Sequence, residues 1–353
     1  MTTSRSRATR RADYPSTLVL ALCTVATLFI GATPSAPAAD IQMKIAHVVP
    51  GASPRGRGAT LTAELISTDS RCEIDARVYP SAQLGGDTDL IEGLQIGSIE
   101  MVILPGSFLV GFQPLLGILD FPFFFPSDWA DLKQVHDSDA MRSLLATTEE
   151  KGIVSLGIWH TGFKVWTSNE RPLNTVESYS GLKARVMPST ILKEQARGIG
   201  LTAVGMPFPE TYSALQIGAI DAQENPITTV FFMKFYEVQE HLALTNHGTL
   251  DQVVMVSGRW WEARSAPCQT AIRQAVTLGG DITAELTFTV IDSQALPAFA
   301  ANGMVVHTLN DEDREMMRAR VLPGIERVYL EQTGVRGRAI LDAFNNEIEK
   351  YAE

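Results

Sequence analysis

Two short segments in the middle of the chain carry residue types that can hold a carboxylate without reacting with it. Residues 181–186, Gly-Leu-Lys-Ala-Arg-Val, are typical of a short strand that presents one guanidinium, that of Arg185. Residues 212–226 are typical of a helix that ends in a polar turn and presents the amide of Asn225. A guanidinium donates two parallel charge-assisted hydrogen bonds to a carboxylate, and an amide beside it adds a directed contact. The two segments together indicate a binding site for an anionic solute.

The elements that position these residues alternate between strands and helices, which predicts an α/β protein. The first half contains predicted strands with apolar or period-two patterns, at residues 43–49, 73–78, 101–104 and 153–159. Helices are expected between them, at residues 58–69, 87–96, 128–136 and 138–151. Asp87 is the expected N-cap of the second helix. No internal repeat is apparent.

The alternation restarts near residue 163, which indicates a second lobe. The predicted elements there are strands at residues 164–168 and 183–186 and helices at residues 189–197 and 208–218. A strand at residues 253–256 then returns the chain to the first lobe, and from about residue 267 the pattern is mainly helical, with a break near residues 303–308 for a last strand. Two lobes joined by several crossovers form a hinge with a cleft between them.

The N-terminus has the pattern of a secretory signal peptide. Four arginines within the first eleven residues precede an uncharged apolar stretch at residues 16–32, and small residues follow up to Ala39. This order predicts export and cleavage at about residue 39. A membrane anchor is the alternative, but the helix-breaking residues 31–37 favour cleavage.

Composition and charge exclude several classes of function. The chain has 353 residues and a net charge of −11, and removal of residues 1–39, with four Arg and one Asp, changes this to −14. Such an acidic protein is a poor binder of nucleic acid or anionic membranes. Cys72 and Cys268 remain after cleavage, either as a disulfide or as two buried thiols. No zinc-binding spacing and no nucleophile–base motif is present, so we expect no structural metal, no cofactor and no enzyme.

The chain resembles the extracytoplasmic solute-binding proteins of TRAP transporters, the DctP-like family, over essentially its whole mature length. Besides residues 181–186, the resemblance rests on motifs at residues 44–47, 79–85, 95–100, 121–123, 167–172, 221–226, 234–239 and 245–247. It implies a type II periplasmic-binding-protein fold, in which two lobes are joined by a hinge and a long bridging helix. We expect lobe I at residues 40–162 plus about 252–290, and lobe II at residues 163–251 plus about 291–353.

The resemblance also implies a function in the periplasm. A monomer would capture a small organic acid by closing its lobes and deliver it to the permease subunits in the membrane. Two alternatives stay open, namely a ligand sensor for a signalling partner and a binder of a zwitterionic solute. Whether a metal ion assists binding is also left open.

Six residues are predicted to contact the ligand: Arg185, Asn225, Phe208, Lys164, Ser107 and His47. By resemblance, Arg185 pairs with the carboxylate, Asn225 adds its amide, and Phe208 lies against the carbon skeleton. Lys164 stands where the family often has arginine, and it lacks the planar two-point grip, so a dicarboxylate specificity does not transfer directly. For Ser107 and His47, local hydrogen bonding is the alternative. Glu224 is expected to hold the hinge or to orient a neighbour, and Asp251 to lie at the hinge.

Overall fold

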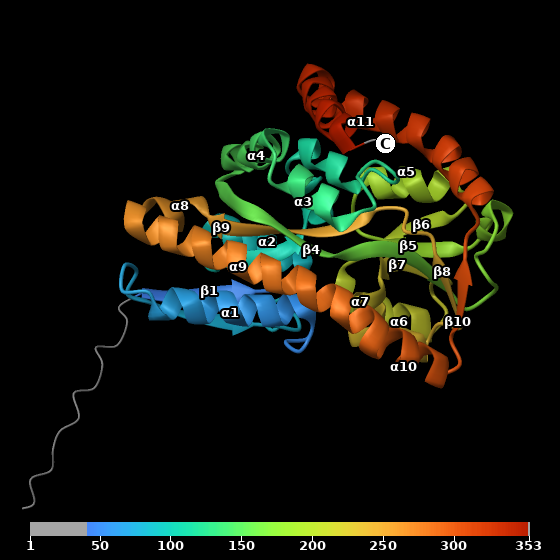
Figure 1. The fold of residues 1–353 in the computed structure, drawn as a ribbon, viewed down its shortest axis with the longest axis horizontal. Coiled ribbons are helices and arrows are strands. Elements are labelled where there is room, and N and C mark those ends of the chain that lie inside the picture. The colour runs from blue at the N-terminus through green and yellow to red at the C-terminus, as the bar shows by residue number, and fades with distance from the viewer. Residues whose placement is uncertain (1–40, 352–353) are drawn as a thin grey trace, which may run out of the picture. The chain divides into compact units, whose positions relative to one another are not determined.

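The computed structural model describes residues 41–351 (Figure 1), and the expected signal peptide at residues 1–39 lies outside them. The ten strands of this part divide into two sheets that define two lobes. The sheet of lobe I contains, in spatial order, β2 (Ile74–Tyr79), β1 (Ile41–Ala46), β3 (Met101–Pro105), β9 (Thr249–Ser257) and β4 (Ile153–Ser168). The sheet of lobe II contains β4, β7 (Ala222–Pro226), β5 (Lys183–Val186) and β6 (Thr202–Gly205), while β8 (His241–Leu244) pairs with β4 and β10 (Val305–Thr308) with β8.

Helices cover both faces of the lobe I sheet, which explains why its strands are apolar on both sides. One face packs against α1 (Pro54–Thr68) and α9 (Ala266–Val290), and the other against α2 (Asp87–Ile96) and α4 (Asp139–Ala146). The remaining helices are α3 (Trp129–His136), α5 (Thr190–Gly198), α6 (Thr211–Gln216), α7 (Ile227–Phe232), α8 (Gly258–Glu262), α10 (Leu296–Ala301) and α11 (Asp311–Ile348). No helix within residues 41–351 combines the length and the apolar character that a bilayer span needs.

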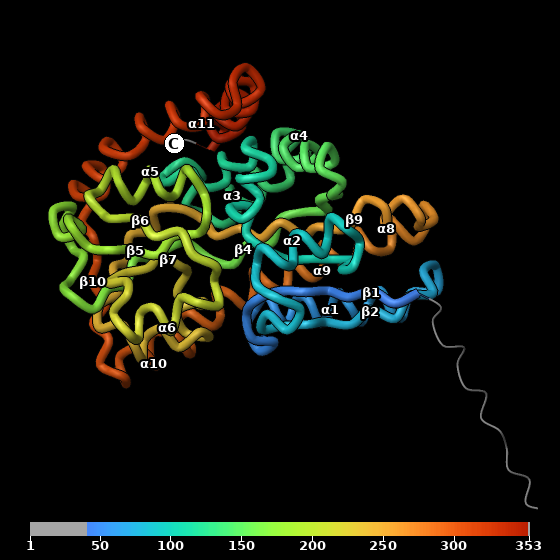
Figure 2. The backbone as a smooth tube through the Cα atoms, turned by 180° about the vertical axis from the view of Figure 1, so that it is seen from behind, coloured from blue at the N-terminus to red at the C-terminus, as the bar shows by residue number. Residues whose placement is uncertain are grey.

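The two lobes contain the same β-α-β-α-β unit, so the expectation of no internal repeat was wrong. In lobe I the unit is β1-α1-β2-α2-β3 with strand order β2-β1-β3, and in lobe II it is β5-α5-β6-α6-β7 with strand order β6-β5-β7. Figure 2 shows both units from the side of α2 and α6. The parallel pairing also has the same register, since Ile45 lies opposite Met101 and Ala184 lies opposite Ala222.

A seven-residue sequence match marks the same point in each unit. Leu-Gln-Ile-Gly-Ser-Ile-Glu (residues 94–100) ends α2 and leads into β3, and Leu-Gln-Ile-Gly-Ala-Ile-Asp (residues 215–221) ends α6 and leads into β7. The glycines have φ of 77° and 69°, the left-handed conformation that ends a helix. The carboxylate that ends each match accepts a backbone N–H from the first strand of its unit. Glu100 accepts that of Lys44 on β1 at 2.7 Å, and Asp221 accepts that of Lys183 on β5 at 2.8 Å. The match is short because the helices of the two units differ in length.

Two elements, β4 and α9, run through both lobes and connect them. Strand β4 pairs with β9 in lobe I and with β7 and β8 in lobe II, with register shifts near Ser155 and between His160 and Phe163. The sequence predicted two separate strands here, because the shifts interrupt the alternation of side chains. Helix α9 extends in Figure 1 from α8 in lobe I to α10 in lobe II and is the expected long bridging helix. The lobe boundaries at residues 162 and 252 stay a prediction.

Three local predictions are corrected by the structure. Gly86, not Asp87, is the N-cap of α2, and Asp87 is instead buried with its carboxylate directed to another segment. Asn225 lies on strand β7 rather than in a polar turn after a helix. The predicted helix at residues 208–218 is a 3₁₀ turn at Phe208–Glu210 followed by the short α6. Strands β6, β7 and β8 were not predicted.

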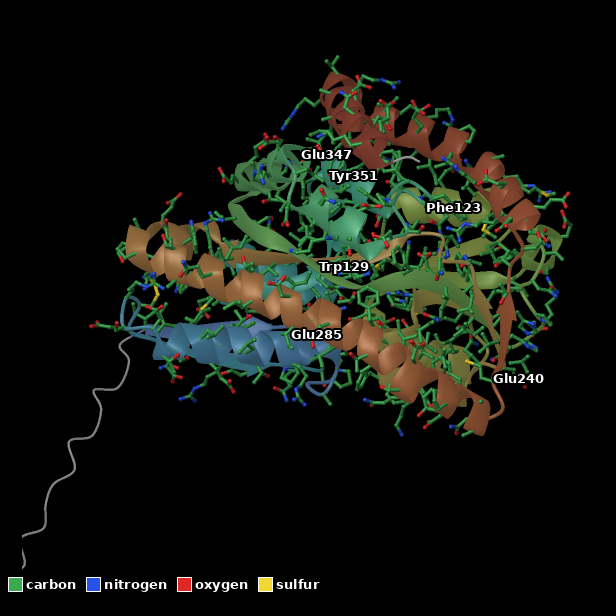
Figure 3. The ribbon with its side chains drawn as sticks, viewed as in Figure 1. Phe123, Trp129, Glu240, Glu285, Glu347 and Tyr351 are labelled. Carbon is green, nitrogen blue, oxygen red and sulfur yellow. A yellow bond between two sulfur atoms is a disulfide. The ribbon has the colours of Figure 1, made fainter. Side chains whose placement is uncertain are left out.

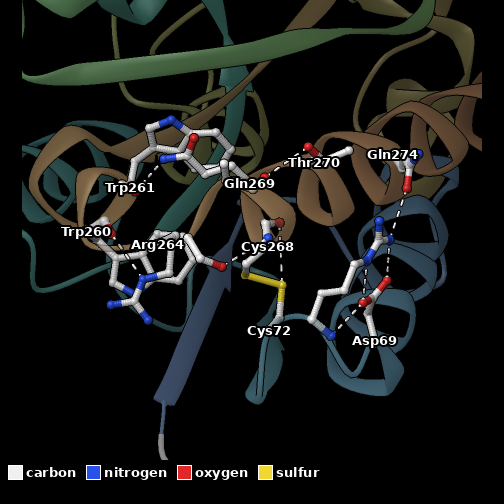
Figure 4. Close-up of a disulfide and its surroundings, with 12 residues drawn as sticks. Asp69, Cys72, Trp260, Trp261, Arg264, Cys268, Gln269, Thr270 and Gln274 are labelled. Carbon is white, nitrogen blue, oxygen red and sulfur yellow. Dashed lines mark hydrogen bonds and ion pairs between the residues drawn. A yellow bond between two sulfur atoms is a disulfide. The ribbon is translucent and has the colours of Figure 1, made fainter.

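A disulfide joins Cys72 to Cys268, which decides between the two alternatives left open by the sequence (Figure 4). Cys72 lies in the turn before β2, and Cys268 lies in the first turn of α9. Both side chains belong to the apolar cluster between α1, α9 and the sheet. The bridge therefore ties the edge of lobe I to the helix that continues into lobe II.

Candidate ligand-binding site

A small pocket lies between the two lobes. Lobe II contributes Arg185, Met187, Phe208 and Asn225, and segments of lobe I and β9 contribute Val48, Arg55, Asp87, Pro105, Phe108 and Leu250. Three of the six predicted ligand residues, Arg185, Asn225 and Phe208, therefore line one pocket. The repeat explains where the pocket lies. Strands β3 and β7 occupy corresponding positions in the two units and end at corresponding prolines, Pro105 and Pro226, beside the pocket.

Arg185 is held in a set orientation by the backbone. Its side chain is buried at 1% exposure, and Nε and Nη2 donate to the carbonyl oxygen of Met206 at 3.2 and 3.0 Å. The guanidinium carbon lies 5.6 Å from the centre of the Phe208 ring. These contacts leave Nη1 for the pocket. Burial lowers the pKa of Arg185 to about 10, so the group is still a cation at neutral pH.

Asn225 is oriented by a chain of buried side chains along β7 and β4. Its Nδ2 donates to Oε1 of Gln223 at 2.6 Å, and Nε2 of Gln223 donates to Oγ1 of Thr167 at 2.9 Å. Thr167 in turn donates to Oε1 of Gln239 at 2.7 Å. Because each partner is satisfied by the next, the amide of Asn225 has one defined direction, and its Oδ1 and second N–H are available to the pocket.

Two buried charged residues of the pocket, Arg55 and Asp87, were not among the predicted ligand residues. Arg55 lies in the first turn of α1, and Asp87 begins α2. Oδ2 of Asp87 accepts the backbone N–H of Phe208 at 2.9 Å, a contact between the lobes. Burial raises the pKa of Asp87 against the opposing effects of this hydrogen bond and of the Arg185 and Arg55 charges. The signal that could have found them is a charged residue at the start of each lobe I helix, facing the end of a strand.

Lys164 and Ser107 do not line this pocket. On β7, Glu224 points to the opposite face from Gln223 and Asn225, and Lys164 lies with its Nζ 3.3 Å from Oε2 of Glu224, both fully buried. Ser107 donates to Oδ1 of Asp120, which is also buried. Both residues belong to a second polar cluster beside the pocket, and their contact with ligand stays a prediction.

Glu224 organises this second cluster, in line with its expected role of orienting neighbours. It accepts hydrogen bonds from Nε2 of His247 at 2.7 Å and from Nε2 of Gln195 at 2.8 Å. Burial opposes its ionisation, but the charge of Lys164 and the hydrogen bond from His247 outweigh burial and lower its pKa to about 2. Burial also lowers the pKa of His247, so a neutral imidazole here donates from Nε2 and accepts the Thr245 hydroxyl at Nδ1. Within this cluster, Lys164 and Glu224 form an ion pair.

His47, the sixth predicted residue, follows β1 directly and is fully buried beside the pocket residues Val48 and Arg55. Burial and the Arg55 charge lower its pKa to about 3, which makes it neutral. Its placement at the end of a lobe I strand agrees with the prediction, and its contact with ligand is untested.

A larger cavity is lined by α3, α4, residues 156–160 of β4 and α9. Beside it, Asp251 accepts from Nε2 of His136 at 3.0 Å and from Nδ1 of His160 at 2.8 Å. Trp129, which is labelled in Figure 3, stacks on His160. These contacts join α3 to the crossing strands, where Asp251 was expected at the hinge. The cavity carries balanced surface charges, so we assign the ligand to the smaller pocket with its buried arginines. Within residues 41–351, no group of three or more His, Cys, Asp or Glu side chains has the geometry to hold a metal ion.

Comparison with known proteins identifies the family of this chain. Residues 45–332 match the family model described as "Bacterial extracellular solute-binding protein, family 7" (DctP). The chain belongs to this family. The C4-dicarboxylate-binding periplasmic protein DctP of Rhodobacter capsulatus is 34% identical over 265 residues, which cover 74% of this chain and 78% of the relative. The resemblance to the solute-binding proteins of TRAP transporters is thus confirmed.

Solved structures confirm the two-lobed α/β fold. A TRAP periplasmic solute-binding protein from Desulfovibrio salexigens with bound orotic acid has a TM-score of 0.85 and 32% identity, covering 88% of this chain and 99% of that chain. The sugar acid binding protein of Advenella mimigardefordensis in complex with galactonate has a TM-score of 0.82 and 27% identity, covering 87% and 100%. This chain is accordingly an extracytoplasmic solute-binding protein of the TRAP type, in a family that serves transport.

Proposed function

We propose that this protein captures a small organic acid between its lobes, with Arg185 as the anchor of the carboxylate. The observation that carries the proposal is a buried guanidinium that makes no ion pair within residues 41–351 and donates only to a backbone carbonyl. A buried charge is costly unless an opposite charge accompanies it. A carboxylate that receives two hydrogen bonds from Arg185 and one from Asn225 supplies that charge.

Lobe closure completes the site. The hydrogen bond between Asp87 of lobe I and the backbone N–H of Phe208 of lobe II crosses the cleft directly at the pocket. Arg185 of lobe II and Arg55 of lobe I both line the pocket and share Asp87 as a neighbouring negative charge, so a bound anion supplies the second negative charge. The solute therefore stabilises the closed state, which is the form that a permease would recognise.

The predicted signal peptide and the named relatives support a periplasmic location for this function. The relative from Rhodobacter capsulatus is a periplasmic protein for C4-dicarboxylates, and the two solved structures contain orotic acid and galactonate. By analogy, this protein works in the periplasm as a monomer, delivers an unchanged acid to TRAP permease subunits and catalyses no reaction. No nucleic acid and no cofactor takes part in this function.

The test is ligand-induced thermal stabilisation of the mature protein across a panel of organic acids. We expect at least one acid to raise Tm, and Arg185→Ala to abolish that rise, because loss of one partner of a buried pair costs roughly 3–5 kcal/mol, about 150-fold or more in affinity. Arg57→Ala, on the exposed face of α1, is the matched control and retains the rise. An acid that stabilises Arg185→Ala as much as the wild type would contradict the anchor.

A further inference from the structure

The lobe I side of the pocket carries buried polar atoms that have no hydrogen-bond partner within residues 41–351. They include Nε and Nη1 of Arg55, Oδ1 of Asp87 and both ring nitrogens of His47. Arg55 and Asp87 line the same pocket as Arg185, and all three are nearly inaccessible to solvent. Native proteins leave few such atoms unpaired, since each costs about 1–3 kcal/mol. The unpaired atoms therefore point to polar groups on the solute.

The charged side chains that line the pocket carry one net positive charge. Arg55 and Arg185 contribute two cations, and Asp87 contributes one anion. Lys164, Glu224 and Asp120 lie outside the lining, and His47 is neutral. A solute with a single negative charge therefore neutralises the pocket. A dianion would leave an excess negative charge buried next to Asp87, which is unfavourable at low dielectric.

The unpaired atoms of Arg55 and Asp87 indicate which chemical group of the solute lies against them. Arg55 needs an acceptor, Asp87 needs a donor, and a hydroxyl is both. An alkyl acid would leave both residues unpaired. A second carboxylate would pair with Arg55 but would be repelled by Asp87, and an ammonium group would pair with Asp87 but would be repelled by Arg55.

We propose that the solute is a hydroxylated monocarboxylic acid, with its carboxylate on Arg185 and Asn225 and a hydroxyl between Arg55 and Asp87. This inference rests on the carboxylate-binding function proposed above and narrows it to one chemical class. Lobe II then binds the acid group and lobe I binds the hydroxyl. Both lobes must contact the solute for the cleft to close, so the hydroxyl determines specificity.

Titration calorimetry with acids of matched length tests the proposal. The four-carbon set is D-erythronate, butyrate, succinate and 4-aminobutanoate, and the six-carbon set is galactonate, hexanoate, adipate and 6-aminohexanoate. We expect a hydroxylated acid to bind at least tenfold more tightly than the other three of its set. A dicarboxylate, alkyl acid or amino acid that binds as tightly would overturn the inference. If Arg185→Ala abolished that binding, the carboxylate function would stand, whereas binding of no acid at all would overturn both.

Two substitutions examine the proposed hydroxyl contacts through ratios of affinities, which are insensitive to the fraction of folded protein. Asp87→Asn removes the opposing charge, so the preference for the hydroxylated acid over the dicarboxylate should fall at least tenfold. Glu92→Gln, at an exposed position of the same helix, is the control and should leave this ratio unchanged. Arg55→Gln should weaken the hydroxylated acid at least tenfold more than the alkyl acid. Unchanged ratios in both pocket variants would refute the assignment of the hydroxyl.

Discussion

The carboxyl of Asp120 is buried in the polar cluster beside the pocket, and the cost of ionising it in the folded protein can be measured. Asp120 ends a 3₁₀ turn (Pro114–Asp120), accepts a hydrogen bond from Ser107, and has no partner for Oδ2 within the described residues. Burial raises its pKa from 3.8 to about 6, although the charge of Lys164 and the Ser107 hydrogen bond act in the opposite direction. A shift of about two units corresponds to about 3 kcal/mol.

The sign of the effect follows from the direction of the shift. Because the pKa in the folded protein lies above that in the unfolded chain, ionisation of Asp120 favours unfolding. The loss of folding stability caused by this ionisation is absent below about pH 4, grows as the pH rises towards 6, and is constant above that. Asp120→Asn retains an oxygen that accepts from Ser107 and cannot ionise. We expect the variant to match the wild type near pH 4 and to be more stable by up to about 3 kcal/mol at pH 7.

Urea unfolding of both proteins at pH 4, 5, 6 and 7 gives the difference in free energy directly. Asp342→Asn, at an exposed position of α11, is the control, and its difference from the wild type should not change with pH. A difference for Asp120→Asn that stays flat between pH 4 and 7, or that decreases as the pH rises, would refute the argument that burial dominates at this carboxyl.

Two further predictions concern the support of the site and of the fold. Gln223→Leu breaks the chain of hydrogen bonds that orients Asn225, so we expect affinity for the bound acid to fall about tenfold, as calorimetry would show, while Gln216→Leu at an exposed position has no effect. Equal affinity in both variants would show that the chain does not orient the amide. Removal of the disulfide by Cys72→Ala with Cys268→Ala should lower the free energy of unfolding by about 2–5 kcal/mol without changing affinity, and a changed affinity would indicate that the bridge shapes the cleft.

Local patterns were enough to predict most of the elements that carry the site. Strands β1, β2, β3 and β5 have apolar or alternating sequences, and α2 and α5 have cap residues and apolar spacing, so short windows of sequence identify them. The short strands β6, β7 and β8 escaped notice. Length is not the reason, since β5 is as short and was predicted, but β7, for example, reads Ala-Gln-Glu-Asn-Pro, a polar sequence without an apolar run. Strand β4 was divided into two because its register shifts interrupt the pattern on both sides of the hinge. The repeat was missed because only seven residues retain it.

Arg185, Asn225 and Phe208, the predicted ligand residues that line the pocket, lie in lobe II, whereas Arg55 and Asp87 of lobe I were not predicted. Arg185 and Asn225 lie in short motifs that resemble the family, so sequence and resemblance pointed to them. Arg55 and Asp87 carry only a weak signal, a charged residue at the start of a helix. The contact of Asp87 with the backbone N–H of Phe208 depends on the tertiary structure.

The sequence alone determined the α/β alternation and the family, and it pointed to three residues of the pocket, because these depend on periodicity and on motifs of a few adjacent residues. Tertiary structure decided which charges share the pocket, whether the two cysteines are bonded, and on which face of β7 each polar side chain lies. The physical reason is that burial and electrostatic interaction depend on distances in space, and the groups involved, such as Asp87 and Phe208, are separated by more than a hundred residues along the chain.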